Sequence, residues 1–554
     1  MDGTSALGRP LVRLLIVAGM AGVLLYGLGN LPYLETSEAR YAEIAREMAV
    51  SGDWVTPRLT FIKHFDKPPL TYWVTAAAFK LLGLNDFSGR LPLVIAALGI
   101  LWFTWRLARL LFPEERPTAA LSVTVLFSSL LFLALSRSLT TDLYLALSTA
   151  GAVSYLFRWF YHDRQTRDAL LSALFLGLGL LTKGHVILVF FLLPWLPAAF
   201  SHRQARPIKV LDICVFMLVP LLLFLPWFLA VLRENPQLLR FFVHDQTYGR
   251  IATNMHHRSE PVYFHLLVLC GGMLFWFTYF LARLPRTLAR RENRTENLLL
   301  LFTLIPLIFF SLNRSKLAPY LLPALPFYAV LIAHWLHVYA SQPAMRWADR
   351  INLVLAGVLV GGEIALPWLP LHAIQIPMWR WEAFAVLSLI LWLGMLAGWR
   401  KWPAVKRLGF AGLNILLFLA AVSVAPALQE HINGFEAMAA AIARDRGAAP
   451  CRIIAYEERL PSITFYTGIR VIQIPHDRNL RFEDTAARQV LDEYVSNDIS
   501  RIPRLLAQPT LTYLIIKQRD WRDLQNQLPG IERLARDFYA GPKYMALVNR
   551  RQGN

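Results

Sequence analysis

Three segments that lie far apart in the chain each combine Lys or Arg with Tyr, His or carboxylate side chains. They cover residues 31–89, residues 233–262 and the short stretch 313–320. Ammonium and guanidinium groups beside hydroxyl donors suit the binding of a phosphate, and neighbouring carboxylates can accept a proton or hold hydroxyl and amine groups. The competing interpretation is ordinary salt bridges and long side chains that extend to a membrane surface.

The first candidate for a phosphate ligand is Lys67, which directly precedes a Pro-Pro pair. The fixed φ of proline restrains the backbone around this ammonium group. Arg250 in the second segment, and Lys316 beside Tyr320 in the third, could complete a cationic cluster. Such a cluster suits the phosphate of an isoprenoid lipid whose tail lies in a groove between helices.

Three carboxylates are candidates for acid–base work, and each has a structural alternative. Glu38 opens a predicted helix, Asp142 follows two threonines before an apolar run, and Asp66 precedes Lys67. Asp142 could equally be a helix N-cap, and Asp66 could equally form a salt bridge. Lys183 marks another basic position at a helix end, where it could instead interact with the helix dipole.

The histidines give little support for a metal site. His256 and His257 could join His244 or His265, but this spacing matches no standard pattern. We therefore expect no certain cofactor and keep a divalent metal only as an alternative. Phosphate-binding glycine motifs in a fitting context are also absent from the sequence, which favours a substrate that is already activated and linked to a lipid.

The composition shows what must position these residues. Of the 554 residues, 56% are hydrophobic and only 17% are charged, whereas globular chains carry about 25% charged residues. The apolar residues form long runs, and a membrane helix needs roughly 20 of them. The sequence thus predicts a multi-spanning membrane protein and excludes a soluble enzyme. Much of the net charge of +19 lies in short loops, where it sets orientation in the membrane, so nucleic acid is not an expected partner.

Thirteen spans are predicted if the N-terminus is cytoplasmic. They lie near residues 11–30, 90–112, 117–136, 140–160, 169–182, 184–200, 210–232, 262–283, 298–312, 320–341, 351–371, 381–399 and 408–428. Lys and Arg then concentrate in the cytoplasmic loops, as the positive-inside rule requires. The long loops 31–89 and 233–262, and everything after about residue 429, fall on the outer face.

The outer segments have their own predicted elements. Residues 37–50 read as an amphipathic helix with Ser37 as its N-cap, and residues 69–84 as a second interfacial helix. After residue 429, three predicted strands (452–456, 469–474, 511–517) and two helices (486–495, 521–528) indicate a small α/β domain. We therefore expect a transmembrane domain over 1–428 and an outer α/β domain over 429–554. The latter could also be a cap without chemistry.

Several motifs resemble a known family. The segments ETSEARYAEIAREM (35–48), SGDW (51–54), FDKPPLTYW (65–73) and GRLP (89–92) look like the first outer loop of C-type glycosyltransferases that use polyprenyl-phosphate sugars. TKG (182–184) and the stretch 250–263 look like later signatures of this group. Over its whole length, the chain is most similar to the bacterial transferases that move 4-amino-4-deoxy-L-arabinose from undecaprenyl phosphate to lipid A. The resemblance is weaker after residue 429.

The resemblance implies an inner-membrane enzyme, acting as a monomer, with its site and C-terminal domain in the periplasm. Undecaprenyl-phosphate aminoarabinose would be the donor and lipid A the acceptor, and the reaction would affect polymyxin sensitivity. The donor phosphate would contact Lys67, Arg250, Lys316 and Tyr320, Lys67 also acting in catalysis with Glu38 and Asp142. The cavity would be lined by Arg40, Tyr41, Asp66, Tyr72, Lys183 and His257.

The sequence departs from the family motif at one position, and two alternative functions stay open. Members of the family often have Asp-Glu where this chain has Ser37-Glu38, so a general base at that position is in doubt. The acceptor could instead be a protein Ser or Thr or another glycan, as for related mannosyltransferases. A lipid flippase is a third possibility, but no inverted repeat is visible and the charges gather on one face.

Overall fold

The structure is a computed structural model. It describes the chain except for residues 1–4, 36, 162–163, 202–208, 242–259, 291–292, 369–377, 399–402, 430, 476–481, 484 and 550–554. The chain forms two compact units. Unit 1 comprises residues 1–28 and 90–424, and unit 2 comprises residues 29–89 and 425–554.

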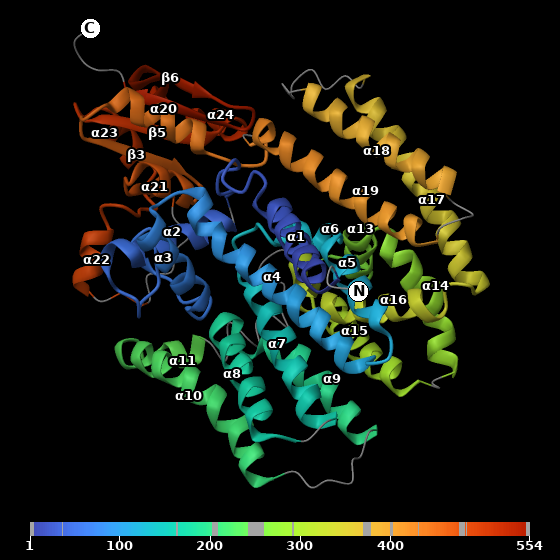
Figure 1. Cartoon of the computed structure of the whole chain (residues 1–554). Coiled ribbons are helices and arrows are strands. Elements are labelled where there is room, and N and C mark those ends of the chain that lie inside the picture. Colours follow the sequence, from blue (N-terminus) through green and yellow to red (C-terminus); the bar gives the residue numbers. More distant parts are fainter. Residues whose placement is uncertain are drawn as a thin grey trace. The chain divides into compact units, whose positions relative to one another are not determined.

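Unit 1 is made of helices (Figure 1). Those of its first half are α1 (Ser5–Leu25), α4 (Asp86–Leu111), α5 (Arg116–Phe127), α6 (Leu130–Leu135), α7 (Thr141–Tyr161), α8 (Thr166–Lys183), α9 (Ile187–Ser201), α10 (Val210–Glu234) and α11 (Leu238–Arg240). Those of its second half are α13 (Phe264–Met273), α14 (Phe275–Arg290), α15 (Arg294–Leu312), α16 (Leu325–Val338), α17 (Pro343–Ala365), α18 (Met378–Gly398) and α19 (Pro403–Val424). Short 3₁₀ segments are η1 (Gly184–Val186), η3 (Ala318–Ala324), η4 (Leu366–Trp368) and η5 (Ala425–Leu428), the last of which begins unit 2.

Each of the thirteen predicted spans overlaps a helix or two consecutive helices among the described residues. Within the described residues, seven helical segments are long and apolar enough to cross a membrane; the full count of thirteen stays a prediction. These seven are Asp86–Leu111, Thr166–Ala199, Val210–Glu234, Arg294–Leu312, Ala318–Val338, Trp381–Gly398 and Lys406–Leu428.

Two of the predicted spans are interrupted. The span at 117–136 divides into α5 and α6 around Ser128 and Ser129. The span at 262–283 divides into α13 and α14 at Leu274, whose φ of 48° is incompatible with a continuing right-handed helix. Hydropathy does not reveal such breaks, because apolar residues lie on both sides of each break.

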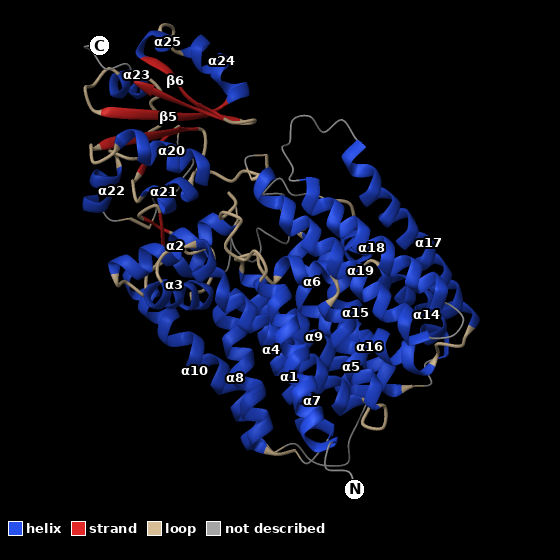
Figure 2. Cartoon of the chain, turned by 45° about the horizontal axis from the view of Figure 1, so that its top comes forward, coloured by secondary structure: helices blue, strands red, loops and turns tan. Residues whose placement is uncertain are grey.

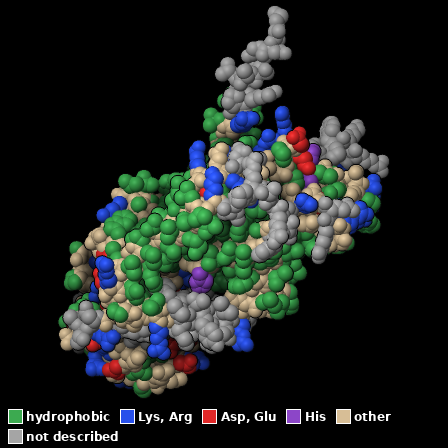
Figure 3. All heavy atoms as spheres, turned by 90° about the horizontal axis from the view of Figure 1, so that it is seen from below, with side chains coloured by type: hydrophobic (Ala, Val, Ile, Leu, Met, Phe, Trp, Pro, Cys, Tyr) green, Lys and Arg blue, Asp and Glu red, His purple; other side chains and the backbone are tan. Residues whose placement is uncertain are grey.

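Large apolar side chains are exposed on several helices of unit 1. Val210 on α10 is 75% exposed, Leu222 is 69% exposed, and Val354 on α17 is 68% exposed. Figure 3 shows hydrophobic side chains spread over a broad area of one face of the molecule. Surfaces of this kind are unfavourable in water and suit contact with lipid.

Unit 2 contains the two-stranded and five-stranded sheets (Figure 2). Its first part holds α2 (Glu38–Ser51), α3 (Leu70–Leu82) and the hairpin of β1 (Arg58–Leu59) and β2 (Ile62–Lys63). Its second part holds β3 (Cys451–Tyr456), β4 (Val471–Ile474), β5 (Leu511–Lys517), β6 (Ala535–Ala540) and β7 (Tyr544–Asn549). The helices of this part are α20 (Glu436–Arg446), α21 (Pro461–Thr467), α22 (Thr485–Leu491), α23 (Arg501–Leu506), α24 (Gln518–Gln527) and α25 (Ile531–Leu534).

The large sheet has the strand order β4-β3-β5-β7-β6. Strands β4, β3 and β5 are parallel, and β7 and β6 continue the sheet antiparallel. Alternate residues of the central strands enter two separate hydrophobic clusters, so both faces of the sheet are covered; Ile453 and Tyr513 belong to one cluster, and Ile454 and Leu514 to the other. The three predicted strands and two predicted helices of this region are confirmed.

The first loop packs with the C-terminal segment inside unit 2. Glu35 accepts hydrogen bonds from the backbone N–H and the hydroxyl of Ser462. The Tyr466 hydroxyl donates to Asp86 at 2.7 Å. The loop 31–89 was expected to belong with residues 1–428, and the structure groups it instead with residues 425–554.

Helix α2 lies in the core of unit 2. The predicted helix is confirmed, with Ser37 at its N-cap position, but the Ser37 side chain makes no capping hydrogen bond. Its expected charged face is buried, because Glu43 pairs bidentately with Arg46 at 2.6 and 2.7 Å and Glu47 accepts from the backbone N–H of Phe61. Paired charges can be buried in this way, which periodicity does not indicate.

Candidate functional site

The predicted site residues that the structure describes form two groups, one in each unit. In unit 2, the carboxylate of Asp66 lies among the basic side chains of Arg40 and Lys67 and the ring of His64. Arg40 Nη1 is 3.6 Å and His64 Nε2 is 3.5 Å from Asp66 Oδ2, and Lys67 is close enough to act on this carboxylate electrostatically. Arg40 projects from the first turn of α2, whereas the other three lie in the segment between β2 and α3.

The electrostatics of this group favour an ionised carboxylate. Burial by itself would raise the pKa of Asp66, but the charges of His64, Lys67 and Arg40 outweigh it and lower this pKa well below its usual range. A carboxylate that is so stabilised is a weak base, so Asp66 suits a charge partner better than a general base. The cations outnumber this carboxylate and give the group an affinity for a further anion.

Two tyrosines form the wall beside this group. The rings of Tyr41 on α2 and Tyr72 on α3 stack, with centroids 5.6 Å apart and an interplanar angle of 28°. The Arg40 guanidinium lies 5.5 Å from the centre of the Tyr41 ring. The structure therefore brings Arg40, Tyr41, Asp66 and Tyr72 together.

Glu38 lies in the first turn of α2 and is 6% exposed. A carboxylate at this position is stabilised by the positive end of the helix dipole. Its charge and its burial are compatible with a contact to the amine or hydroxyls of a sugar.

In unit 1, Asp142 and Lys183 form a close ion pair. Lys183 Nζ donates to Asp142 Oδ1 at 2.6 Å, and their side chains are 9% and 8% exposed. Asp142 lies in the first turn of α7 and Lys183 in the last turn of α8, and these two helices pack side by side. The Lys183 ammonium is also 4.7 Å from the centre of the Tyr320 ring in η3, which is a cation–π contact.

Lys316 and His265 lie beside Tyr320 in the same unit. Lys316 Nζ donates to the backbone carbonyl of Glu260 at 2.8 Å. The His265 ring stacks near Tyr320, with centroids 6.3 Å apart, and its Nε2 is 3.3 Å from the Leu317 carbonyl. The structure thus brings Asp142, Lys183, Lys316 and Tyr320 to one region of unit 1.

The remaining predicted site residues lie outside the described residues. These are Arg250, His244, His256 and His257. In the part of the chain that is described, no three His, Cys, Asp or Glu side chains are arranged to hold a metal ion. His265 has the contacts given above and no metal-binding group around it within that part.

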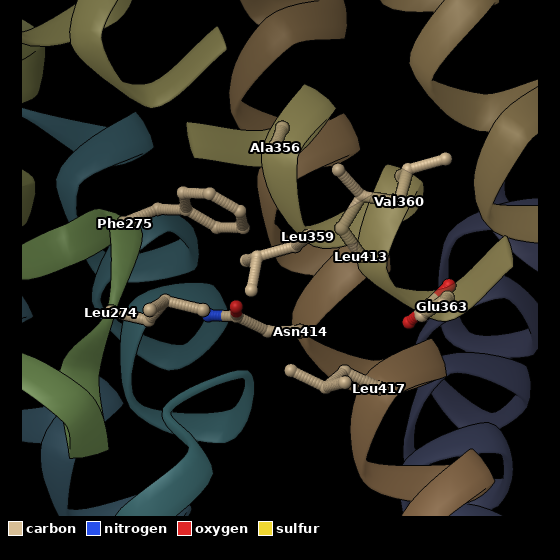
Figure 4. Close-up of a pocket in the computed structure, with 9 residues that line it drawn as sticks. All are labelled: Leu274, Phe275, Ala356, Leu359, Val360, Glu363, Leu413, Asn414 and Leu417. Atoms are coloured by element: carbon tan, nitrogen blue, oxygen red, sulfur yellow. The ribbon is translucent and has the colours of Figure 1, made fainter. Parts of the chain in front are cut away.

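A polar pair inside the helices of unit 1 was not predicted. Glu363 on α17 and Asn414 on α19 are the polar members of the nine residues that line a cavity of about 10 Å³ (Figure 4). Asn414 is fully buried, and among the described residues neither its amide oxygen nor its nitrogen has a hydrogen-bond partner. The space is about that of one water molecule. A carboxylate within the apolar run 351–371 was the signal that could have revealed this pair.

Comparisons with known proteins agree with this arrangement. Residues 66–229 match the family described as dolichyl-phosphate-mannose-protein mannosyltransferase. The crystal structure of ArnT from Cupriavidus metallidurans bound to undecaprenyl phosphate is similar, with a TM-score of 0.78 and 22% identity over 98% of both chains. That likeness shows the fold, which is mostly α-helical with a small C-terminal α/β region.

Two curated relatives carry the same name. Undecaprenyl phosphate-α-4-amino-4-deoxy-L-arabinose arabinosyl transferase 1 of Pseudomonas fluorescens is 28% identical over 476 residues, which are 82% of this chain and 84% of that protein. Its namesake in Sodalis glossinidius is 31% identical over 394 residues, which are 67% of this chain and 67% of that protein. This chain therefore belongs to the family of undecaprenyl phosphate-α-4-amino-4-deoxy-L-arabinose arabinosyl transferases.

Proposed function

We propose that this protein transfers 4-amino-4-deoxy-L-arabinose from undecaprenyl phosphate to a phosphate group of lipid A. The observation that carries the proposal is the 31% identity to a named arabinosyl transferase over two thirds of both chains. The likeness to a solved fold that holds undecaprenyl phosphate supports it. The cationic group around Asp66 and the buried Lys183 and Lys316 supply the charge that such a phosphate substrate needs.

The chemistry is a substitution at the anomeric carbon of the sugar. An oxygen of the acceptor phosphate forms the new bond to this carbon, and the bond from the carbon to the undecaprenyl phosphate oxygen breaks. The leaving phosphate takes the bonding electron pair and gains negative charge. Cations that are already in place around it stabilise the transition state more than the ground state. The acceptor phosphate is already anionic near neutral pH, so it attacks without losing a proton.

The residue roles follow from charge and position. In unit 2, we assign Lys67 to the donor phosphate, and Arg40, Tyr41 and Tyr72 to the wall of the cavity, with Asp66 orienting the cations. Glu38 would contact the amine or hydroxyls of the sugar.

In unit 1, we assign Lys316 and Tyr320 to the donor phosphate, together with Arg250. Asp142 would act on the sugar, and its ion pair with Lys183 would fix its position. His257 is proposed to line the cavity.

The location of the reaction is part of the proposal. We place the protein in the bacterial inner membrane, with the reaction and the C-terminal region on the periplasmic side, because Lys and Arg concentrate in the opposite loops. A periplasmic reporter enzyme fused after Asn554 is expected to be active and a cytoplasmic one inactive. The reverse result would contradict both the orientation and the thirteen-span count.

A second acceptor class has one observation in its favour. The match of residues 66–229 to a protein mannosyltransferase family is compatible with transfer to a Ser or Thr hydroxyl. Mass spectrometry of lipid A from cells with and without the protein separates the two. We expect one added aminoarabinose per modified phosphate when the protein is present. Unchanged lipid A, with new glycopeptides, would favour the alternative.

A further inference from the structure

The second part of unit 2 contains an open groove of about 670 Å³. It lies at the amino ends of the parallel strands β3 and β4, where Cys451 and Arg470 are among the residues that line it. Its volume is within the range of small-molecule sites, which is about 300–1,000 Å³. None of the residues assigned above to the transfer reaction lines this groove.

Four arginines from three segments line the groove. They are Arg452 on β3, Arg470 just before β4, and Arg501 and Arg504 on α23. Two carboxylates, Glu493 and Asp498, also line it, so the formal charge of the lining is 4 − 2 = +2. This charge is concentrated in one concave surface, which raises the local concentration of anions.

Two of the guanidinium groups are held in place by contacts that do not neutralise them. Arg470 lies 3.7 Å from the centre of the Phe61 ring and 4.4 Å from the centre of the Tyr494 ring. Arg501 donates to the backbone carbonyls of Asp492 and Glu493 at 2.6 and 2.7 Å. Both side chains are therefore ordered before a ligand arrives, which reduces the entropy lost on binding.

The other two arginines have polar partners within the groove. Arg452 donates to the side-chain oxygen of Gln508, and Arg504 pairs with Asp498 and donates to the Ser500 hydroxyl at 2.9 Å. Asp498 is also held by the backbone N–H of Ser500 at 3.0 Å. A ligand would thus meet fixed donors and fixed carboxylate acceptors side by side.

This mixture of groups restricts the chemistry of the ligand. Guanidinium groups bind phosphate in a two-pronged geometry. Carboxylates repel a plain polyanion but accept hydrogen bonds from hydroxyl or ammonium groups. The Tyr494 ring and the apolar side chains of Ile469 and Leu505 offer a surface for a sugar ring. A phosphorylated amino sugar has the anion, the donors and the flat apolar face that these groups match.

We propose that this groove binds the phosphorylated amino-sugar headgroup of a glycolipid, as a docking site separate from the residues of the transfer reaction. The inference deepens the proposed function and rests on it, since lipid A is a glycolipid of this chemistry. The groove holds one headgroup in the same unit that carries Lys67 and Asp66.

The groove contains a cysteine whose labelling can report ligand binding. Cys451 lines it, and Cys214 and Cys270 lie on helices of unit 1, so replacing those two by Ser leaves one thiol. Burial raises the pKa of the Cys451 thiol above its ordinary value, so a smaller fraction of it is the reactive thiolate. The measurement is the rate of Cys451 labelling in the full-length protein, with and without a probe.

The probes separate the possible sources of the ligand. They are glucosamine 1-phosphate, inorganic phosphate, and phospholipid vesicles with or without lipid A. At a probe concentration about ten times its Kd, we expect labelling to slow about tenfold, since mass action fills ~90% of the sites. Glucosamine 1-phosphate and vesicles with lipid A should both slow labelling, and vesicles without lipid A should not.

The variants test the arginines. Arg452→Gln combined with Arg504→Gln should remove the protection, whereas Arg533→Gln combined with Arg536→Gln, which changes exposed arginines outside the groove, should keep it. The ratio of rates with and without probe is taken within each variant, which corrects for any change in Cys451 itself. The single variant Arg452→Gln, with partial loss of protection, serves if the double variant does not fold.

Four results would overturn the inference. Three of them are equal labelling with and without glucosamine 1-phosphate, protection that survives the groove double variant, and protection by inorganic phosphate that is as strong as that by the sugar phosphate. The fourth is protection by the free sugar phosphate alone, without any from lipid A vesicles, which would exclude a glycolipid. Transfer activity is measured in the same protein. Absence of protection with normal transfer overturns only the proposed docking site in the groove. Loss of transfer with normal protection overturns only the proposed reaction.

Discussion

Asp66 and Asp142 both contact basic side chains, but their surroundings differ. The Asp66 side chain is 30% exposed and lies among Arg40, Lys67 and the His64 ring. The Asp142 side chain is 8% exposed, and within the described residues its close cation is Lys183, at 2.6 Å. The first group has positive charge in excess and suits the binding of an anion, whereas the second is a neutral pair that fixes two helix ends. We therefore expect substitutions in the first group to affect transfer, and substitutions in the second to affect stability as well.

The largest expected effect is that of Lys67→Ala. The substitution removes the cation that we assign to the leaving phosphate, and loss of one such group lowers kcat by about 100-fold or more. Transfer from a synthetic polyprenyl-phosphate sugar in vitro measures it. The matched control is Lys80→Ala on α3, an exposed lysine of the same segment, which should keep nearly normal activity. Normal transfer by the Lys67 variant would remove this residue from the site.

The second largest effect is expected from Asp142→Ala, which tests whether Asp142 and Lys183 form a mutually neutralising pair. Asp142→Ala leaves the Lys183 ammonium buried without its carboxylate, and breaking a buried pair in this way costs about 3–5 kcal/mol. The double variant Asp142→Asn with Lys183→Met should cost clearly less, because no buried charge is left. Thermal unfolding in detergent measures both. Equal losses in the single and double variants would contradict the description of a mutually neutralising pair.

A smaller effect is expected from Glu38→Gln. If the acceptor is a phosphate, no base is needed, so this variant should lose only a few-fold in rate, far less than the roughly 10²–10⁴-fold that general-base catalysis supplies. The dependence of the rate on pH between about pH 5 and 8 should stay shallow. If Glu38→Gln were as inactive as Lys67→Ala, a hydroxyl acceptor would become the better interpretation. The cations around Asp66 would then no longer be the main catalytic groups.

The smallest effect concerns the pH dependence of stability. Because the surrounding cations lower the pKa of Asp66 in the folded protein, its ionised form stabilises the fold. That contribution is complete above the unfolded-state pKa of about 3.9 and is lost as the pH falls through the lower folded-state value. The difference in Tm between the unchanged protein and Asp66→Asn should therefore be constant from about pH 5 to 8 and shrink below about pH 4. A difference that grew as the pH fell below about pH 4 would contradict the stabilising role of the ionised Asp66.

The sequence alone predicted most of the helices and strands and some of the residues of each candidate group. Apolar runs predicted the helices of unit 1, and the change in composition after residue 429 accompanied the predicted strands β3, β4 and β5, because such patterns can be read from neighbouring residues. Lys67, Asp66 and Arg40 were found because they lie in one short segment with recognisable motifs. The breaks at Ser128 and Leu274 were not found, since apolar residues continue on both sides of each break.

Tertiary structure alone decided which charges meet and which segments fold together. Lys183 is 41 residues from its partner Asp142, and Glu35 is 427 residues from its partner Ser462. The local sequence does not show which lysine or serine of the chain forms each contact. The same holds for the four arginines of the groove, which come from β3, the start of β4 and α23. Hydrophobic periodicity specifies the face that an element buries, whereas ion pairs and hydrogen bonds depend on distances of about 3 Å that only the packed chain sets.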